Sequence, residues 1–298
     1  GNALVFPPQK MAVSLSPQNL IAFFLIAVFA GSLTFQVVNL TTTSLWHDEA
    51  FSALLIQYED YGEMLHRISL DVHPPLYYML LRAWAGIFGD SLFDLRLFSL
   101  MFGLFSMLAT FLVAQEIFKK RNLAFLCALV LGMSSFQVQY NLEARMYTLG
   151  AFFVLLATFF LIRGLKTRIP SRQFSLFLAL YALCAAAALY THYYTFFALA
   201  AHALFAVWWL RFQIKKLLFV SLGFVASGIL FLPWLPVFLR QLSQVQESFW
   251  IPPLHIWSIP TTISKMAIGD GLDPNQAALL IIFINIAVLA GFLCMLFR

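Results

Sequence analysis

The chain has 298 residues, of which 62% are hydrophobic, only 10% are charged and 33 are phenylalanine. This much apolar surface excludes a soluble enzyme and predicts an all-α, polytopic membrane protein. The formal net charge is +5, but it does not indicate nucleic-acid binding. The basic residues form short clusters between apolar runs, where they act as topology determinants.

Eight apolar stretches are long enough to cross a bilayer, which takes about 20 residues each. In chain order they are residues 20–40, 95–117, 123–141, 147–163, 174–191, 195–211, 217–237 and 276–297. Residues 1–19 are expected to form an N-terminal tail, in which 1–10 are either a vector-derived tag or a native extension. Residues 20–298 are then predicted to be a single transmembrane domain.

The stretch 74–89 is apolar but short, begins with two prolines and carries Arg82 in its middle. If it does not cross the membrane, the basic clusters at 119–121, 163–172 and 211–216 all fall on one face, as the positive-inside rule requires. If it does cross, the rule is broken for every later loop. We therefore predict that 74–89 is a helix lying along the membrane surface.

This topology places the polar chemistry on the extracytoplasmic face of a cell membrane. Most of the Lys and Arg residues become cytoplasmic, and every acidic residue except Glu116 falls on the other side. The first extracytoplasmic loop, 41–94, is expected to carry interfacial helices. A second extracytoplasmic region, 234–275, is marked by the proline-containing runs PWLPVF and FWIPPL.

The first candidate element is LWHDEAFS, residues 45–52, with the adjacent carboxylates of Asp48 and Glu49. Neighbouring residues on a helix point about 100° apart. One carboxylate can therefore face a cavity while the other braces the loop. Acidic residues in the first turn of a helix are common without any active site, and for this pair alone that explanation is the simpler one.

Two further elements fall on the same predicted face. YNLEARMY, residues 140–147, carries Glu143 and Arg145, and LYTHYYTFF, residues 189–197, carries His192 and Tyr193. A loop salt bridge accounts for the first pair, and an interfacial aromatic belt accounts for the tyrosines. Ionisable residues at membrane depth, however, mark functional sites by default.

Together these elements carry the groups needed for group transfer at a membrane surface. A carboxylate can deprotonate an acceptor hydroxyl, and arginines hold phosphate through paired hydrogen bonds. The inventory suits a reaction on a phosphate-linked lipid.

Taken in order, LWHDEAFS, DVHPPLYYMLLRAW, DLRLFSLMFG and YNLEARMY resemble the membrane glycosyltransferases of the GT-C superfamily. The likeness is to the glycosyltransferase family 39 branch, which contains protein mannosyltransferase-like and aminoarabinose-transferase-like enzymes. Order and spacing match over about residues 20 to 200, and FLPWLP with SFWIPP extends the match to about 253. The resemblance implies a GT-C fold, a polyprenyl-phosphate sugar donor and transfer with inversion at the anomeric carbon.

The resemblance also implies roles for single residues. Asp48 is expected to be the catalytic base, Glu49 a supporting carboxylate and Glu143 the second acidic residue of the catalytic set, while Arg145 is a candidate contact to the donor phosphate. The expected substrate-binding residues, some from the resemblance and others from their predicted face, are Asp71, His73, Arg82, Arg96, Arg145, His192 and Tyr193.

No cofactor is assigned beyond the lipid-linked sugar, which is a substrate. Asp48, Glu143 and His192 are the residue types that bind a divalent ion, but no fixed ligand spacing supports a metal site, so none is assigned. The expected partners are a polyprenyl-phosphate sugar, membrane lipids and a lipid, glycan or protein acceptor.

Two other functions compete with glycosyl transfer. A transporter or lipid flippase would need ionisable residues along a path through the bilayer, whereas the middles of the predicted spans contain little beyond His202. A purely structural membrane subunit would bury both Asp48 and Glu143 against helices. Because the resembling enzymes usually have further spans, the chain is expected to be C-terminally truncated or a minimal member.

Overall fold

A computed structural model describes residues 17–58, 60–247, 253, 256, 258–268 and 278–296. Within these residues all regular structure is helical, which confirms the predicted all-α class. The helices are α1 (Pro17–Asn39), α2 (His47–Leu55), α3 (Tyr61–Leu70), α4 (Leu76–Phe88), α5 (Leu92–Phe118), α6 (Arg121–Met133), α7 (Ser135–Asn141), α8 (Tyr147–Lys166), α9 (Arg172–Thr191), α10 (Thr195–Trp209), α11 (Ile214–Phe231), the 3-10 turn η1 (Leu232–Trp234), α12 (Leu235–Glu247), α13 (Ser258–Ile268) and α14 (Ala278–Leu296).

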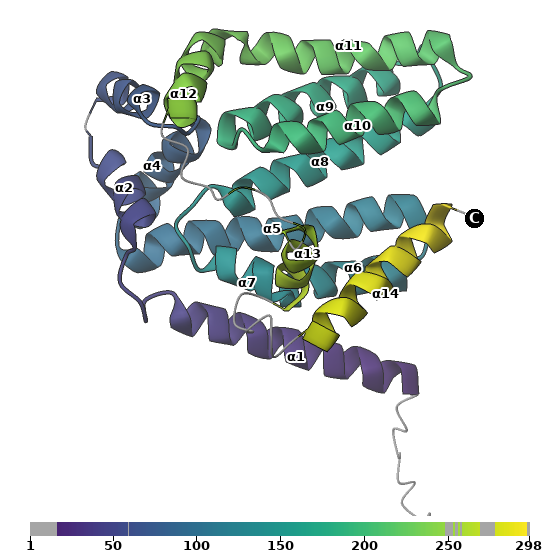
Figure 1. Ribbon diagram of the computed structural model, residues 1–298, viewed down its shortest axis with the longest axis horizontal. Helices are drawn as coiled ribbons and strands as arrows, with labels where there is room; N and C mark the ends of the chain where they lie inside the picture. Colours follow the sequence, from purple (N-terminus) through teal and green to yellow (C-terminus); the bar gives the residue numbers. More distant parts are fainter. Residues whose placement is uncertain are drawn as a thin grey trace, which may run out of the picture.

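The helices form a bundle with two chemically different ends. The long helices α5, α8, α9, α10 and α11 run roughly side by side, and the short helices α2, α3 and α4 gather with α12 at one end, on the left of Figure 1. The loops with the basic clusters 119–121, 163–172 and 211–216 lie at the opposite end. We call these the α2–α4 end and the basic end.

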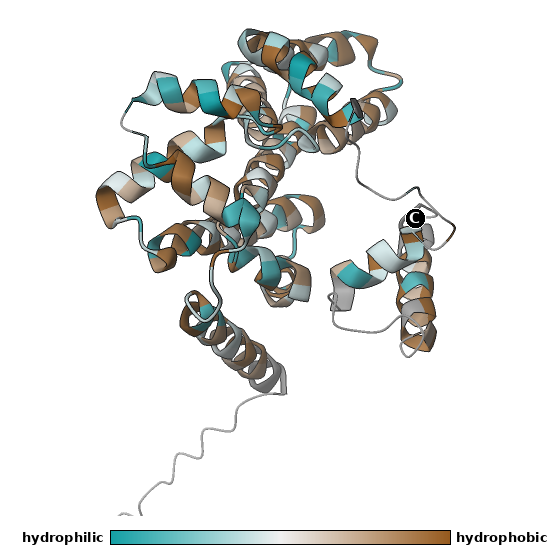
Figure 2. Cartoon of the chain, turned by 60° about the vertical axis from the view of Figure 1, so that its left-hand side comes forward, coloured by the Kyte–Doolittle hydropathy of each residue, from teal (hydrophilic) through white to brown (hydrophobic). Residues whose placement is uncertain are grey.

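The outer surface of the long helices is apolar. Leu108 of α5 and Leu183 of α9 are both 57% exposed, and Figure 2 shows hydrophobic residues along most of each helix of the bundle. A helix that is hydrophobic all round is stable where its surroundings are hydrocarbon. The fold therefore fits a multi-pass membrane protein.

The described residues contain fewer clear spans than the eight predicted. Four helices are long and apolar enough to cross a membrane, and α6 with α7, bent by 61°, makes a fifth if the pair is one span. The predicted spans 20–40, 195–211 and 276–297 correspond to shorter apolar helices. The clear spans are Leu92–Phe118, Tyr147–Lys166, Arg172–Thr191 and Ile214–Gln246. A count of about eight spans stays a prediction.

The break between α6 and α7 has a local cause. Ser134 has extended backbone angles, and its side chain accepts a hydrogen bond from the backbone N–H of Gln137 at 3.2 Å. It therefore ends one helix and caps the next. The short α7 then leads into the loop that carries Glu143 and Arg145.

Residues 41–94, predicted as a loop with interfacial helices, fold into α2, α3 and α4 and end in the first turn of α5. Asp60 caps α3 by accepting from the backbone N–H groups of Gly62 and Glu63, and Ser91 caps α5. The apolar faces of the three helices share one core with α5 and the α7–α8 loop. Its members include Leu55, Met64, Tyr77, Tyr78, Leu95, Phe98 and Met146. The interfacial position of α4 stays a prediction.

A second core joins α8, α9, α10 and α11. Ala157 and Ala185 are fully buried in it, since small residues let apolar helices approach closely. In the same layer, Thr158 Oγ1 of α8 lies 2.9 Å from His202 Nε2 of α10. His202 thus has a helix-packing partner. Of the predicted region 234–275, the structure describes α12 and α13, while most of FWIPPL lies outside the described residues.

Candidate active site

Glu49 forms a buried ion pair at the α2–α4 end. It lies in the first turn of α2 and is 0% exposed. Arg96 Nε and Nη2, from α5, donate to its two carboxylate oxygens at 2.8 and 2.7 Å. The backbone N–H groups of Trp46 and Ala144 donate to the same oxygens at 3.3 and 2.7 Å. Four donors fill the acceptor sites of the carboxylate.

The hydrogen-bond donors of Arg96 are likewise all used. Its Nη1 donates to the carbonyl oxygens of Leu40 and Thr43 at 2.8 and 2.9 Å, and its Nη2 donates to the carbonyl of Ser44 at 3.1 Å. All five guanidinium N–H groups therefore have acceptors within the chain. This geometry favours a supporting role for both side chains. That is the role expected for Glu49 within the catalytic set, whereas Arg96 was predicted to bind substrate.

Asp48 has the opposite environment. Its side chain is 38% exposed, with Oδ2 at 3.4 Å from Arg145 Nη2 and Oδ1 at 3.4 Å from Nδ1 of the exposed His47. Because adjacent helical residues point in different directions, a single turn of α2 presents one buried and one accessible carboxylate. The accessible one is the predicted base.

Arg145 connects Asp48 to the loop before α4. Its Nη1 donates to the backbone carbonyl of Asp48 at 3.2 Å, and its Nη2 lies 3.2 Å from His73 Nε2. His73 Nδ1 in turn lies 2.8 Å from Asp71 Oδ2. A guanidinium can only donate, so in this contact Nε2 accepts and Nδ1 carries the proton shared with Asp71. Four predicted site residues are thus brought together.

Arg145 is a fixed positive charge in this cluster. It is 2% exposed, and its Nε has no hydrogen-bond partner in the part of the chain that the structure describes. Burial opposes its charge, but the nearby Tyr78, Tyr147 and Asp48 side chains outweigh burial and raise the pKa of Arg145. The guanidinium therefore stays protonated and keeps a donor, Nε, that no group of the described residues uses.

Glu143 lies two residues before Arg145 in the α7–α8 loop. Its Oε1 accepts from Gln139 Nε2 at 3.4 Å. Burial raises the pKa of the Glu143 carboxyl, with the negative charge of Glu49 adding to the effect. This carboxyl is therefore easier to protonate than an exposed one.

His192 caps the C-terminus of α9 and packs against Tyr147, the first residue of α8. Its ring centroid lies 5.5 Å from that of Tyr147, and its Nδ1 accepts from the backbone N–H of Tyr194 at 3.2 Å. Burial is the main cause that lowers the pKa of His192 to about 4, and the interactions with His73 and Arg145 add to it. The ring is therefore neutral near pH 7.

Tyr193 is held by α12. Its hydroxyl donates to Gln241 Oε1 and accepts from Trp234 Nε1 at 2.8 Å. Gln241 Nε2 donates to the backbone carbonyls of Ile68 at 3.0 Å and of His73 at 3.4 Å. Tyr193 therefore acts through Gln241 to fasten α12 over the His73 loop, and this role resembles support more than substrate contact.

Arg82 is held at the interface of α3 and α4. Its guanidinium carbon lies 3.8 Å from the centre of the Tyr61 ring, a cation–π distance. Of the substrate-binding residues predicted from the sequence, the structure thus joins Asp71 and His73 to Arg145, brings His192 beside that cluster, and gives Arg82, Arg96 and Tyr193 partners of their own.

Within the described residues no group of three or more His, Cys, Asp or Glu side chains is placed to hold a metal ion. The set of Asp48, Glu143 and His192 does not form such a group there.

Gln241 was not among the site residues predicted from the sequence. It lies on α12 and is 1% exposed. Its neighbours are a charged residue, Arg240, and an apolar one, Leu242. Its only signal in the sequence is its place on an amphipathic helix, where an amide on the inner face has to find hydrogen-bond partners when buried.

Comparisons with known proteins agree with this fold. A sequence model of the family described as dolichyl-phosphate-mannose-protein mannosyltransferase matches residues 72–236, which is more than half of the chain. The comparison with curated proteins found no match. Among solved structures, the S. cerevisiae protein O-mannosyltransferase Pmt1-Pmt2 complex bound to the sugar donor is similar, with a TM-score of 0.53 and 16% identity.

That similarity covers 84% of this chain and 37% of the yeast chain. At this identity it shows a shared fold, and the chain spans little more than a third of the relative's length.

Proposed function

Because the chain belongs to the family of dolichyl-phosphate-mannose-protein mannosyltransferases, we propose that it is an integral-membrane glycosyltransferase that takes its sugar from a polyprenyl-phosphate donor. The observation that carries the proposal is the pairing of an accessible carboxylate, Asp48, with a buried and permanently charged arginine, Arg145. The first can accept a proton and the second can hold a phosphate.

The reaction is a single displacement. Asp48 takes the proton of an acceptor hydroxyl, and the oxygen attacks the anomeric carbon on the side opposite the phosphate. The bond between that carbon and the phosphate oxygen breaks, and polyprenyl phosphate leaves with the bonding electron pair. The sugar is transferred with inversion, and Arg145 stabilises the charge that develops on the departing phosphate.

The neighbouring side chains position these two groups. Asp71 orients His73 through Nδ1, and His73 Nε2 holds the guanidinium of Arg145. The pair of Glu49 and Arg96 fixes the first turn of α2 against α5, so the backbone that carries Asp48 cannot shift easily. Such preorganisation lowers the cost of reaching the transition state.

The reaction is assigned to the extracytoplasmic face of a cell membrane. The observation in favour is the separation of charge, with the site at the α2–α4 end and the basic loops at the other end (Figure 1). Basic loops are retained in the cytoplasm. We also propose that the chain has a GT-C arrangement with about eight spans. The acceptor in this proposal is a hydroxyl group of a lipid, glycan or protein.

The test uses membranes that contain the full chain and a radiolabelled polyprenyl-phosphate mannose. Asp48→Asn is expected to reduce sugar transfer by at least about 100-fold, the usual effect of losing a general base, while its thermal unfolding stays that of the wild type. Asp90→Asn, an exposed aspartate in the same segment, is the matched control. Wild-type transfer by Asp48→Asn contradicts the assignment of the base.

A binding measurement covers the case in which the sugar is not mannose. Polyprenyl phosphate alone is expected to raise the unfolding temperature of the purified wild type, and Arg145→Gln is expected to lose that stabilisation. If polyprenyl phosphate stabilises neither protein, the donor class is wrong.

A further inference from the structure

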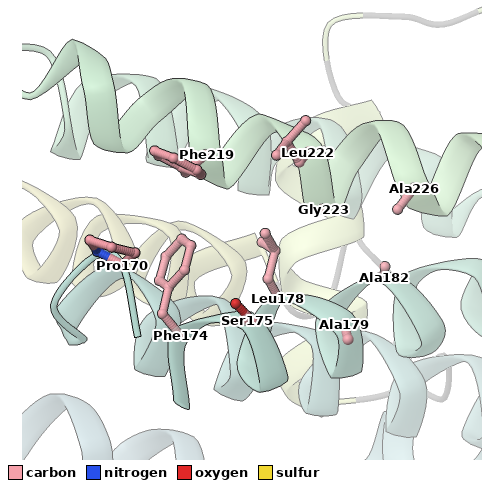
Figure 3. Close-up of a pocket in the computed structure, with 10 residues that line it drawn as sticks. All are labelled: Pro170, Phe174, Ser175, Leu178, Ala179, Ala182, Phe219, Leu222, Gly223 and Ala226. Carbon is pink, nitrogen blue, oxygen red and sulfur yellow. The ribbon is translucent and has the colours of Figure 1, made fainter. Parts of the chain in front are cut away.

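A groove of about 390 Å³ lies between α9 and α11, away from the candidate active site (Figure 3). Phe174 and Leu178 of α9 form one wall, and Phe219 and Leu222 of α11 form the other. Pro170, in the α8–α9 loop, closes the end nearest the basic loops. The lining is apolar except for one serine, and its volume lies within the range of small-molecule pockets.

A glycine determines the floor of the groove. A Cβ atom on Gly223 would lie 2.4 Å from Leu178 Cδ1, so a larger residue here would force the Leu178 side chain to move, and glycine favours the close approach of α11 to α9. Phe219 and Leu222 precede it along α11, and the small side chain of Ala226 follows it (Figure 3). Gly223 is itself part of the lining that the two helices share.

The length of the groove matches one leaflet of a bilayer. From Phe174 to Ala182 the lining follows α9 for about 12 Å at the rise of an α-helix. Half of the hydrocarbon core is about 15 Å thick. A channel that starts at the end of a span and continues to mid-membrane fits an acyl chain that enters from that leaflet.

The mouth of the groove is positively charged. Arg172 begins α9 beside Pro170, and Lys215 and Lys216 lie one turn before Phe219 on α11. Lys216 Nζ donates to the carbonyl of Leu165 at 2.6 Å, which joins the start of α11 to the end of α8. Lys215 and Arg172 make no ion pair within the described residues, and their charge attracts an anion.

No acidic residue of the neighbouring segments neutralises this charge. The sequence contains no Asp or Glu between Glu143 and Glu247. At the basic end, Glu116 already accepts from Lys119, Arg163 and Lys166 at 2.7, 3.2 and 3.2 Å. An anion at the mouth therefore has to come from outside the described fold.

We propose that this groove binds an anionic glycerophospholipid of the leaflet at the basic end, with one acyl chain between α9 and α11 and the phosphate at Arg172 and Lys215. Basic pockets between transmembrane helices on this side bind anionic head groups, and the apolar channel adds the burial of the chain. The 20 residues of α9 separate this mouth from His192 by about 30 Å. The lipid is therefore distinct from a sugar donor at Asp48, and the proposal does not depend on the transfer reaction.

The experiment is native mass spectrometry of the full chain, purified in detergent, with dioleoyl phosphatidylglycerol or dioleoyl phosphatidylcholine added. The wild type is expected to retain one phosphatidylglycerol in preference to phosphatidylcholine. Arg172→Gln combined with Lys215→Gln is expected to weaken retention of phosphatidylglycerol by about tenfold and to leave phosphatidylcholine unchanged. Ala179→Phe, which narrows the groove, is expected to weaken retention of phosphatidylglycerol as well.

Two matched controls test specificity. Arg121→Gln combined with Arg211→Gln removes two charges from the same end but none from the groove, and Leu176→Phe enlarges an exposed residue of α9 outside the lining. Both controls are expected to bind like the wild type. The proposal is overturned if the wild type retains both lipids equally, if the charge control loses as much as the groove variant, or if Ala179→Phe binds as well as Leu176→Phe.

Discussion

Each end of the bundle holds a buried carboxylate, but the two are neutralised in different ways. At the α2–α4 end, Glu49 pairs with a single arginine, Arg96, and the two side chains are 0% and 3% exposed. At the basic end, the side chain of Glu116 is 9% exposed, while its three cationic partners are 35 to 62% exposed. The two sites therefore differ mainly in the exposure of the cationic partners, and less in the exposure of the carboxylates.

This difference has an energetic consequence. Removing Glu49 leaves the guanidinium of Arg96 in a dry interior, where an unpaired charge is costly. Removing Glu116 leaves long side chains that can turn their charges into water. The α2–α4 end thus depends on one pair, whereas the basic end shares its charge among several groups.

The largest expected effect is that of Glu49→Gln. The variant keeps the size of the side chain but leaves the buried charge of Arg96 without a counter-ion. We therefore expect a loss of about 3–5 kcal/mol in the free energy of unfolding. Chemical unfolding in detergent micelles, followed by tryptophan fluorescence, measures it. A loss no larger than that of Glu116→Gln would remove the proposed difference between the two ends.

A pH dependence at the α2–α4 end is expected next. The pKa of His192 is lowered from 6.5 to about 4, so below pH 6.5 the unfolded chain binds a proton that the folded chain does not. Stability attributable to this group therefore falls as the pH drops from 6.5 towards 4, by up to about 3 kcal/mol.

The measurement for His192 is the difference in unfolding free energy between the wild type and His192→Asn at several pH values. Asparagine keeps an acceptor near the position of Nδ1 but does not titrate. The wild type should lose stability relative to the variant below pH 6.5, and parallel curves would contradict the buried, neutral state of His192.

Glu116→Gln is expected to cost less, about 1 kcal/mol, because the three cations that it releases are already partly in water. The same unfolding experiment measures this loss. Added salt should reduce it, since the pairs are accessible to ions. If the loss of unfolding free energy were independent of salt and as large as that of Glu49→Gln, the ion pairs at the basic end would be as inaccessible to water as the pair of Glu49 and Arg96.

The smallest effect is expected for Glu63→Gln. Glu63 and Arg67 pair within α3, four residues apart, with side chains 41% and 52% exposed. Such a pair contributes little, so the unfolding midpoint should not move measurably. A clear shift of the unfolding midpoint would mean that the pair of Glu63 and Arg67 is shielded from water when the protein is in its membrane-like environment.

Part of the candidate site followed from the sequence. The carboxylates, the YNLEARMY loop and the LYTHYYTFF loop were predicted to share one face, and the structure brings Asp48, Arg145 and His192 to the same end of the bundle. Topology is readable because the positions of basic clusters between apolar runs depend on composition along the chain.

The partners of individual side chains did not follow from the sequence. Arg96 and Glu49 are 47 positions apart, and Arg145 and His73 are 72 apart. No local sequence pattern indicates which arginine pairs with which carboxylate. For this reason Arg96 was predicted to bind substrate, although all its donors are used within the chain.

The sequence by itself determined that this protein is an all-helical membrane protein with most of its acidic groups at one end and its basic clusters at the other, because hydropathy and charge order are properties of the linear chain. Only the tertiary structure decided that Glu49 is buried while Asp48 is open, and that Asp71 and His73 hold Arg145. Those assignments depend on how α2, α4 and α5 pack around the α7–α8 loop, and packing is a property of contacts between distant residues.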